Sequence, residues 1–142
     1  MFRHLINSFG VDMHELGSLV YDHFSNIHPS DALTVSTNNV VKNSVFVQDL
    51  SKPVLYRGIY TIWYLLGAGL SLTLYETNQV YGVVRGSETA YSKKLDQDET
   101  IVVGSNVVYV AATQGRNNAR VVITGGWDIV SDEFLINKYQ FL

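Results

Sequence analysis

The stretch QVYGVVRGSETAYSKK, residues 79–94, decides the fold class of this chain. It holds two short runs rich in valine, tyrosine and threonine, Gln79–Val84 and Thr89–Lys94, with Gly86-Ser87 between them. β-Branched and aromatic residues favour strands, whereas a glycine–serine pair favours a turn. The stretch therefore predicts two consecutive strands with a turn between them.

The same pattern continues on both sides of this stretch. Eight further runs have the composition of strands, namely Ala32–Ser36, Ser44–Asp49, Tyr60–Leu66, Ser71–Glu76, Thr100–Val103, Val107–Ala112, Arg120–Thr124 and Phe134–Lys138. Short strands with turns about every ten residues are typical of an all-β sandwich or barrel. We find no linker and no low-complexity tract, so we predict a single domain over residues 1–142, mainly β, with a barrel over residues 27–142.

The first 26 residues follow a different pattern. Apolar side chains recur there mostly at steps of three and four residues, at Leu5, Phe9, Met13, Leu16, Leu19, Val20 and Phe24, with a break at Gly10. This periodicity favours a helix. We therefore predict an N-terminal helical segment over residues 1–26 that acts as a lid or plug on the barrel.

The composition restricts the classes of function. Only 16% of the 142 residues are charged, below the usual ~25%, which favours a homodimer that hides one face. The net charge of −3 gives no attraction to nucleic acid. The absence of cysteine excludes disulfide scaffolds, thiolate zinc sites and thiol nucleophiles.

The sequence also indicates where the protein resides. Its N-terminus lacks the unbroken apolar core of a signal peptide. The most apolar stretch, Ile59 to Leu74, is interrupted by polar residues and by two glycines, and it is too short for a membrane helix. We therefore expect a soluble, cytoplasmic protein without a membrane partner.

Four blocks resemble a family of small single-domain cupins that carry an N-terminal His-Pro-Glu-Gly-Gly motif. Ile27-His28-Pro29 is similar to its His-Pro, and the run over residues 59–66 is similar to its long apolar strand. Residues 78–86 resemble its Asp-Glu-Ile-Trp-His block, and residues 121–134 resemble its Gly-Phe-Asp ending. The resemblance implies a cupin-type double-stranded β-helix, an RmlC-like jelly-roll barrel, preceded by the helical segment.

The chain departs from this family at the polar positions inside the barrel. The Glu-Gly-Gly after the proline is Ser-Asp-Ala here, the acidic pair is Asn78-Gln79, and the strand histidine is Gly82. All four histidines, at positions 4, 14, 23 and 28, precede the predicted barrel strands. Cupin metal sites need inward-facing histidines and a glutamate. We therefore expect no metal, no cofactor and no catalytic residue.

A neutral, aromatic pocket inside the barrel is the candidate site. The resemblance places six residues there as ligand-binding candidates: Trp63, Thr73, Tyr75, Gln79, Tyr81 and Tyr109. His28 and Arg85 are candidates for the barrel mouth. Such a lining is typical of a site for an uncharged small molecule. The alternative is that the large aromatic side chains fill the barrel and leave no cavity.

The favoured function is a degenerate cupin that binds a small neutral ligand or forms a dimeric scaffold, without metal catalysis. Enzymatic activity is left open, with a non-enzymatic role favoured. One alternative is a metal-free cupin isomerase, epimerase or lyase that uses barrel tyrosines, with Tyr81 beside Arg85 or Gln79. Another is a viral or structural jelly-roll protein, since capsid subunits share that fold.

Overall fold

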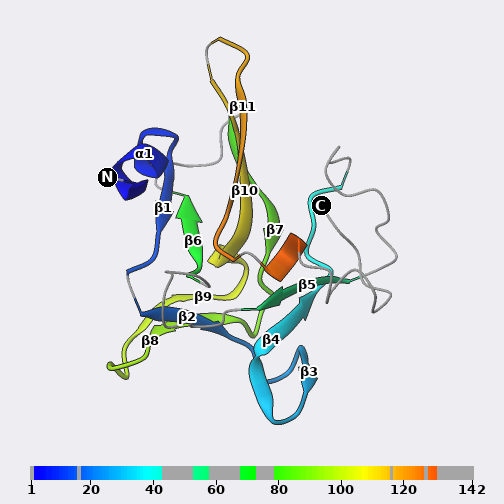
Figure 1. Cartoon of the computed structure of the whole chain (residues 1–142). Coiled ribbons are helices and arrows are strands. Elements are labelled where there is room, and N and C mark those ends of the chain that lie inside the picture. Colours follow the sequence, from blue (N-terminus) through cyan, green and yellow to red (C-terminus); the bar gives the residue numbers. More distant parts are fainter. Residues whose placement is uncertain are drawn as a thin grey trace.

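The computed structural model describes residues 2–15, 17–42, 53–57, 68–72, 79–115, 117–126 and 128–130, and this part of the chain is mainly β (Figure 1). One helix opens it, α1 (Phe2–Ser8). The strands that follow are β1 (Val11–Met13), β2 (Ser18–Tyr21), β3 (Asn26–His28), β4 (Asp31–Thr37), β5 (Val54–Arg57), β6 (Leu70–Leu72), β7 (Val80–Arg85), β8 (Tyr91–Lys94), β9 (Thr100–Val103), β10 (Val108–Gln114) and β11 (Arg120–Thr124). Two short 3₁₀ turns, Gly104–Asn106 and Asp128–Val130, complete the described elements.

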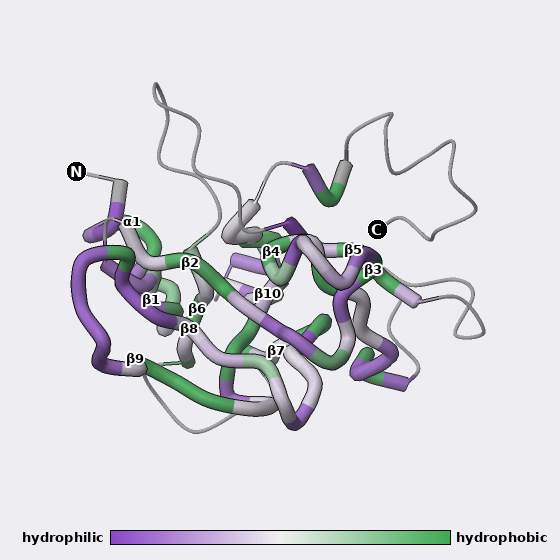
Figure 2. The backbone as a smooth tube through the Cα atoms, turned by 90° about the horizontal axis from the view of Figure 1, so that it is seen from below, coloured by the Kyte–Doolittle hydropathy of each residue, from purple (hydrophilic) through white to green (hydrophobic). Residues whose placement is uncertain are grey.

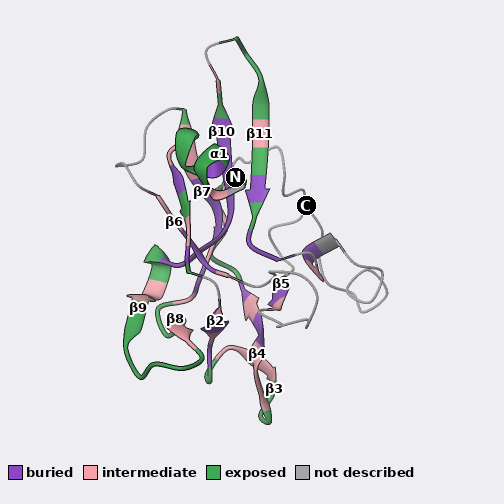
Figure 3. Cartoon of the chain, turned by 60° about the vertical axis from the view of Figure 1, so that its left-hand side comes forward, coloured by how far each residue is buried: buried purple, intermediate pink, exposed green. Residues whose placement is uncertain are grey.

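The largest sheet is organised around β10. Its strand order is β1-β6-β10-β11, and β7 also pairs with β10. All of these pairings are antiparallel. Every residue of β10 except Gln114 is buried, as the purple strand in Figure 3 illustrates. A strand that is covered on both faces has no need of polar alternation, which explains the apolar run Val108-Tyr109-Val110-Ala111-Ala112.

Two three-stranded sheets lie at the other end of the molecule, β2-β8-β9 and β3-β4-β5 (Figure 1). One hydrophobic cluster joins all three sheets. It includes Val20, Val35, Val54, Tyr56, Val83, Val84, Tyr109 and Val110. Full burial of one such side chain contributes about 1.5–3 kcal/mol. This shared cluster therefore holds the two small sheets against the large one.

A second cluster attaches α1 to the large sheet. Ile6 of the helix is buried with Val11 of β1, Leu70 of β6 and Val108 of β10. The helix ends at Ser8, and the chain turns at Gly10, whose φ of 80° lies in the left-handed region. Glycine adopts that conformation without the steric cost of a side chain. The turn directs Val11 into its pairing with Leu72.

The predicted mainly β class is confirmed, and several strands match closely. The predicted strands Thr100–Val103 and Arg120–Thr124 are β9 and β11 with the same bounds. β4, β7, β8 and β10 each lie within three residues of their predicted bounds. The strands predicted over residues 44–49, 60–66 and 134–138 lie outside the described residues, as does most of 71–76. The single domain over residues 1–142 stays a prediction.

The helical segment predicted over residues 1–26 is not confirmed, because only Phe2–Ser8 is helical. The rest of that segment contains β1, β2 and the start of β3. Two left-handed glycines interrupt any helix here, Gly10 and Gly17, the latter with φ 81°. β5 was also missed. The three observed sheets do not confirm the cupin jelly roll.

Candidate functional site

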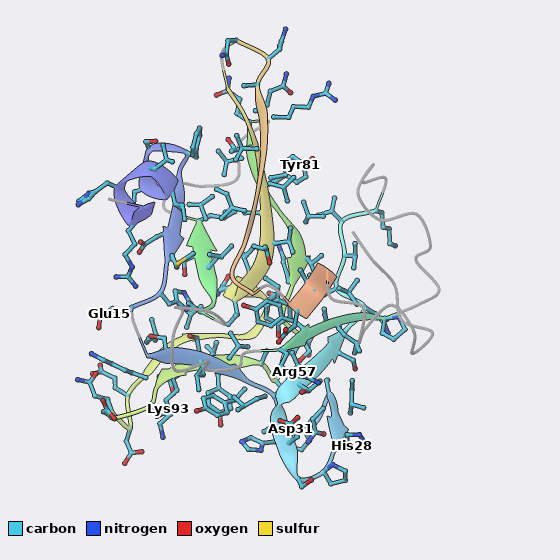
Figure 4. The ribbon with its side chains drawn as sticks, in the orientation of Figure 1. Glu15, His28, Asp31, Arg57, Tyr81 and Lys93 are labelled. Carbon is cyan, nitrogen blue, oxygen red and sulfur yellow. The ribbon has the colours of Figure 1, made fainter. Side chains whose placement is uncertain are left out.

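A surface groove of about 360 Å³ lies where the sheet β2-β8-β9 meets the hairpin β3-β4. Its aromatic and charged lining consists of Tyr21, His23, Asp31, Tyr91 and Lys93, and Leu95 is among the other lining residues. Figure 4 places Lys93 and Asp31 on either side of it, on β8 and β4. We refer to this feature as the aromatic groove.

Three rings form the centre of the aromatic groove. Tyr21 and Tyr91 face each other across β2 and β8, and their rings stack with centroids 5.5 Å apart at 18°. His23 stacks on Tyr91 at 5.9 Å, and its Nε2 is 2.9 Å from the Tyr91 hydroxyl. Stacked cross-strand pairs of this kind stabilise the sheet. Burial, and then the neighbouring Tyr91, raise the pKa of Tyr21, so its hydroxyl stays protonated at neutral pH.

The groove carries one charge of each sign. The Lys93 ammonium is 2.8 Å from the exposed Asp98 carboxylate, and this hydrogen bond raises the pKa of Lys93. The Asp31 carboxylate accepts hydrogen bonds from the Thr34 hydroxyl at 2.6 Å and from the Leu33 amide at 3.0 Å. The Thr34 bond is the largest cause that lowers the pKa of Asp31. Both groups are therefore ionised at neutral pH.

A buried carboxylate fixes the loop that carries His23. Asp22 is 1% exposed, and it accepts hydrogen bonds from the amides of Phe24 and Ser25 at 2.9 and 3.0 Å. The hydroxyls of Ser87 and Thr89 also donate to it. Burial alone would raise the pKa of Asp22, but these four hydrogen bonds outweigh it and lower the pKa. Asp22 is thus an ionised anchor beside the groove.

A second polar cluster surrounds His14, which is 5% exposed. Its Nδ1 lies 2.8 Å from the Ser92 hydroxyl, and its Nε2 lies 2.6 Å from the Ser71 hydroxyl. A Cβ on Gly69 would lie 2.8 Å from the ring, so the imidazole packs directly against backbone. Burial lowers the pKa of His14, although the Asp12 carboxylate opposes this shift. The cluster ties β6 and β8 together through neutral hydrogen bonds.

This buried histidine predicts a pH dependence of stability. The unfolded chain binds a proton at His14 near the ordinary pKa of 6.5, and the folded chain binds it only at a lower pH. The free energy of unfolding should therefore be constant above about pH 6.5 and fall below it, by at most about 1.4 kcal/mol per pH unit. Urea unfolding of the wild type and of His14→Gln between pH 5 and 8 measures this slope.

His14→Gln should lack the fall in the free energy of unfolding below about pH 6.5 that the histidine causes. His28→Gln, at an exposed position, should keep it. Equal slopes for the wild type and His14→Gln would contradict the assignment.

Among the described residues, no group of three or more histidine and acidic side chains is arranged to hold a metal ion.

Of the three predicted pocket residues that the structure describes, two contact the shared cluster and one is exposed. Tyr109 is 1% exposed and stacks on Tyr56, with centroids 4.3 Å apart at 5°. Tyr81 is half-buried on β7 and packs against the shared cluster, at the other end of the molecule from the aromatic groove (Figure 4). Gln79 is exposed, and its carbonyl accepts from the Gln114 amide at 2.8 Å. Trp63, Thr73 and Tyr75 lie outside the described residues.

The two predicted mouth residues lie on different strands, His28 on β3 and Arg85 on β7. His28 is exposed at the end of β3, and its carbonyl accepts from the side-chain Nδ2 of Asn26 at 2.9 Å. Arg85 ends β7, and its guanidinium donates to the Ser105 carbonyl at 3.2 Å while lying over Gly82. Burial lowers the pKa of Arg85. A ligand-binding role for the eight candidates stays a prediction.

Sequence reasoning missed the aromatic groove because its residues fell in two segments treated separately. Tyr21 and His23 were assigned to the helical segment, where a spacing of two residues does not share a face. On a strand that spacing does share a face. Tyr91 and Lys93 have the same spacing in β8, and this alternation was the available signal.

The comparisons with known proteins decide the family. A family model described as the N-terminal domain of OST48 matches residues 1–141. The chain belongs to the OST48 family. Among the OST48 relatives is the 48 kDa subunit of dolichyl-diphosphooligosaccharide–protein glycosyltransferase from Caenorhabditis elegans, 30% identical over 146 residues, covering 96% of this chain and 31% of the relative.

Subunits with the same name from Arabidopsis thaliana and Danio rerio are also similar to this chain. The former is 31% identical over 150 residues, covering 99% of this chain and 32% of the relative. The latter is 29% identical over 147 residues, covering 97% of this chain and 31% of the relative. The chain thus spans about a third of the length of these OST48 relatives.

Membership of the OST48 family corrects the cupin assignment. The four blocks that resembled a cupin consist mainly of apolar residues and glycines, which many β proteins share. The predicted degenerate cupin is therefore wrong, and so are its alternatives, the metal-free isomerase, epimerase or lyase and the viral or structural jelly-roll protein.

The predicted partners and location are wrong for the same reason. A homodimer with a small neutral ligand does not fit a family whose relatives are named as subunits of a glycosyltransferase. The predicted cytoplasmic location does not fit membership of the OST48 family either, whose relatives are named as subunits of a dolichyl-diphosphooligosaccharide–protein glycosyltransferase. In the described residues, no helix has the length and hydropathy needed to span a membrane.

Proposed function

We propose that this chain forms part of a subunit of a dolichyl-diphosphooligosaccharide–protein glycosyltransferase and that it works by assembling with other subunits. The family match over residues 1–141 carries this proposal. The coverage of 96–99% of the chain by three relatives with that name supports it. In this proposal the protein resides at the membrane that holds the dolichol-linked donor.

The outward face of β9 is a suitable contact surface for another subunit. Ile101 and Val103 are 42% and 58% exposed, and their spacing of two places them on one face of the strand. Val102, between them, packs against the shared cluster. Figure 2 draws β9 in green along the rim of the molecule. Exposed apolar side chains that adjoin one another are typical of protein–protein contacts.

The double substitution Ile101→Asp and Val103→Asp tests this proposal. Two carboxylates on a desolvated contact leave buried unpaired charge, so co-purification of other glycosyltransferase subunits should fall at least about tenfold. The measurement is quantitative mass spectrometry of the tagged protein isolated from detergent-solubilised membranes. Thermal unfolding of the variant should stay close to that of the wild type, since both side chains already face solvent.

Val122→Asp is the matched control, because Val122 is 45% exposed but lies on β11. It should leave co-purification unchanged. If the wild-type protein brings down no glycosyltransferase subunit, the proposed function is wrong. If the β9 variant and the control behave alike, the function can stand but β9 is not the contact.

A further inference from the structure

We propose that the aromatic groove binds a segment of a neutral oligosaccharide. The biological source of that glycan rests on the proposed function, since the donor named for the relatives is a dolichyl-diphosphooligosaccharide. The occupant is an extended glycan on the outer surface, not a small molecule enclosed by a barrel. The groove itself rests on side chains that the structure describes.

The aromatic rings provide the apolar half of such a site. A pyranose presents C–H bonds on one face, and those C–H bonds are attracted to the electron-rich face of an aromatic ring. Tyr21, Tyr91 and His23 form a continuous stack on one side of the sheet. His23 is exposed and both tyrosines are only half-buried. Because Tyr21 and His23 each stack on Tyr91, a sugar would contact the ring edges and the ring faces that meet no other ring.

The polar groups provide the other half. Sugar hydroxyls both donate and accept hydrogen bonds, so they are best matched by a mixed set of partners. The Asp31 carboxylate accepts only, the Lys93 ammonium donates only, and the Tyr21 hydroxyl can do both. A few polar groups around an aromatic floor fix a ligand's orientation.

The charges argue against an anionic ligand. Lys93 is already paired with Asp98 at 2.8 Å, and the Asp31 carboxylate lines the same groove. A phosphate or diphosphate would approach that carboxylate at close range, which is repulsive. The sugar residues, and not the diphosphate, are therefore the part of the donor that fits.

The backbone argues against a bound polypeptide. An extended peptide usually gains affinity by pairing with a free strand edge. At the groove, Ser18–Tyr21 pairs with β8, and the amide of Asp22 donates to the carbonyl of Ala32 at 3.0 Å. These bonds occupy the backbone of β2 on the side of β8 and at its end beside β4. A peptide could therefore not pair with β2 along the edge that faces β8, or at Asp22.

The groove is fixed before any ligand arrives. The buried Asp22 holds the loop that carries His23 through the Phe24 and Ser25 amides. It also holds the segment before β8 through Ser87 and Thr89. A rigid site loses little conformational entropy when it binds a ligand. This favours measurable affinity even for a shallow groove.

Amide chemical shifts of the full 142-residue chain test the proposal. Mannotriose and diacetylchitobiose, each titrated to about 20 mM, should shift the amides of Tyr21, His23, Tyr91 and Lys93, with a Kd of order millimolar. Tyr91→Ala removes the central ring and should weaken binding at least about tenfold. Tyr91→Phe keeps the ring and should stay within about threefold of the wild type.

Two further variants cover the case in which Tyr91→Ala fails to fold. His23→Ala removes an exposed ring of the stack and should weaken binding at least about threefold. His28→Ala removes an exposed histidine outside the groove lining and should leave binding unchanged.

Several results would overturn the proposal. The first is the absence of any shift with either saccharide in the folded wild type. The second is unaltered saccharide binding in both His23→Ala and Tyr91→Ala. The third is a shift of the same amides with inorganic pyrophosphate or a neutral peptide but with neither saccharide. The outcome is separable from the β9 experiment. Loss of subunit co-purification tests the proposed function, whereas saccharide titration tests the groove in the isolated chain.

Discussion

Replacing Gly125 with alanine should destabilise the protein by roughly 3 kcal/mol. A Cβ at this position would overlap the carbonyl oxygen of Ala68 and would lie 2.7 Å from the hydroxyl oxygen of Tyr56. That hydroxyl donates to the same carbonyl at 3.0 Å, and the Gly125 amide donates to the Tyr109 carbonyl at 3.2 Å. The backbone segments must therefore separate to admit a methyl group. Urea unfolding measures the loss.

Gly115→Ala is the matched control for this substitution. Its added Cβ would meet the end of the Asn117 side chain at 3.1 Å. That side chain accepts one exposed hydrogen bond, from the Ala119 amide at 3.2 Å, which water can replace if the side chain moves. The control should change the free energy of unfolding by less than about 1 kcal/mol. A Gly125→Ala protein as stable as the control would mean that the close approach to Ala68 is not a constraint on the fold.

Replacing Asp22 with alanine should cost a similar amount, roughly 3 kcal/mol. The change leaves two backbone amides, of Phe24 and Ser25, and two hydroxyls, of Ser87 and Thr89, without their shared acceptor. Hydrogen bonds to a buried carboxylate are stronger than neutral ones, and orphaned donors carry a desolvation penalty. Thermal unfolding monitored by circular dichroism measures the loss.

The same carboxylate predicts an acid dependence with a defined sign. Because the folded pKa of Asp22 is below its ordinary value of 3.8, its contribution is fully present above that pH and is lost as the pH falls through the folded pKa. Asp22→Asn should remove this component. Asp98→Asn, at an exposed carboxylate, should leave the melting temperature near neutral pH unchanged. Equal melting temperatures for Asp22→Ala and Asp98→Asn would refute the anchoring role.

The strands that the sequence predicted well are those with local signals. β9 and β11 contain runs of valine and isoleucine, and residues that favour turns flank each run on both sides. Composition alone therefore delimits these two strands. The sequence did not predict β1 and β2, because Val11, Leu19 and Val20 also fit a helical period. The left-handed conformations of Gly10 and Gly17 interrupt the helical period. The presence of a glycine in the sequence does not by itself reveal its φ angle.

The candidate site was missed for a different reason, since its local alternation does not say which strands pair. The Tyr21–Tyr91 stack depends on the register between β2 and β8, and a shift of one residue would move either side chain to the other face of the sheet. The burial of Asp22 has no local signal in the sequence, since its donors at Ser87 and Thr89 are 65 and 67 residues away. The cupin resemblance failed because it relied on strand and turn residues, which specify a fold class and not a family.

The pairing of β1 with β6, and of β6 with β10, has a consequence for how this chain is made. A ribosome releases Val11 early, but its partner Leu72 and then Val108, which pairs with Leu70, emerge much later. The His14 ring must likewise wait for Ser92, 78 residues downstream. The N-terminal strands therefore emerge unpaired during synthesis. Their hydrophobic side chains therefore stay without their partners until β10 has been synthesised.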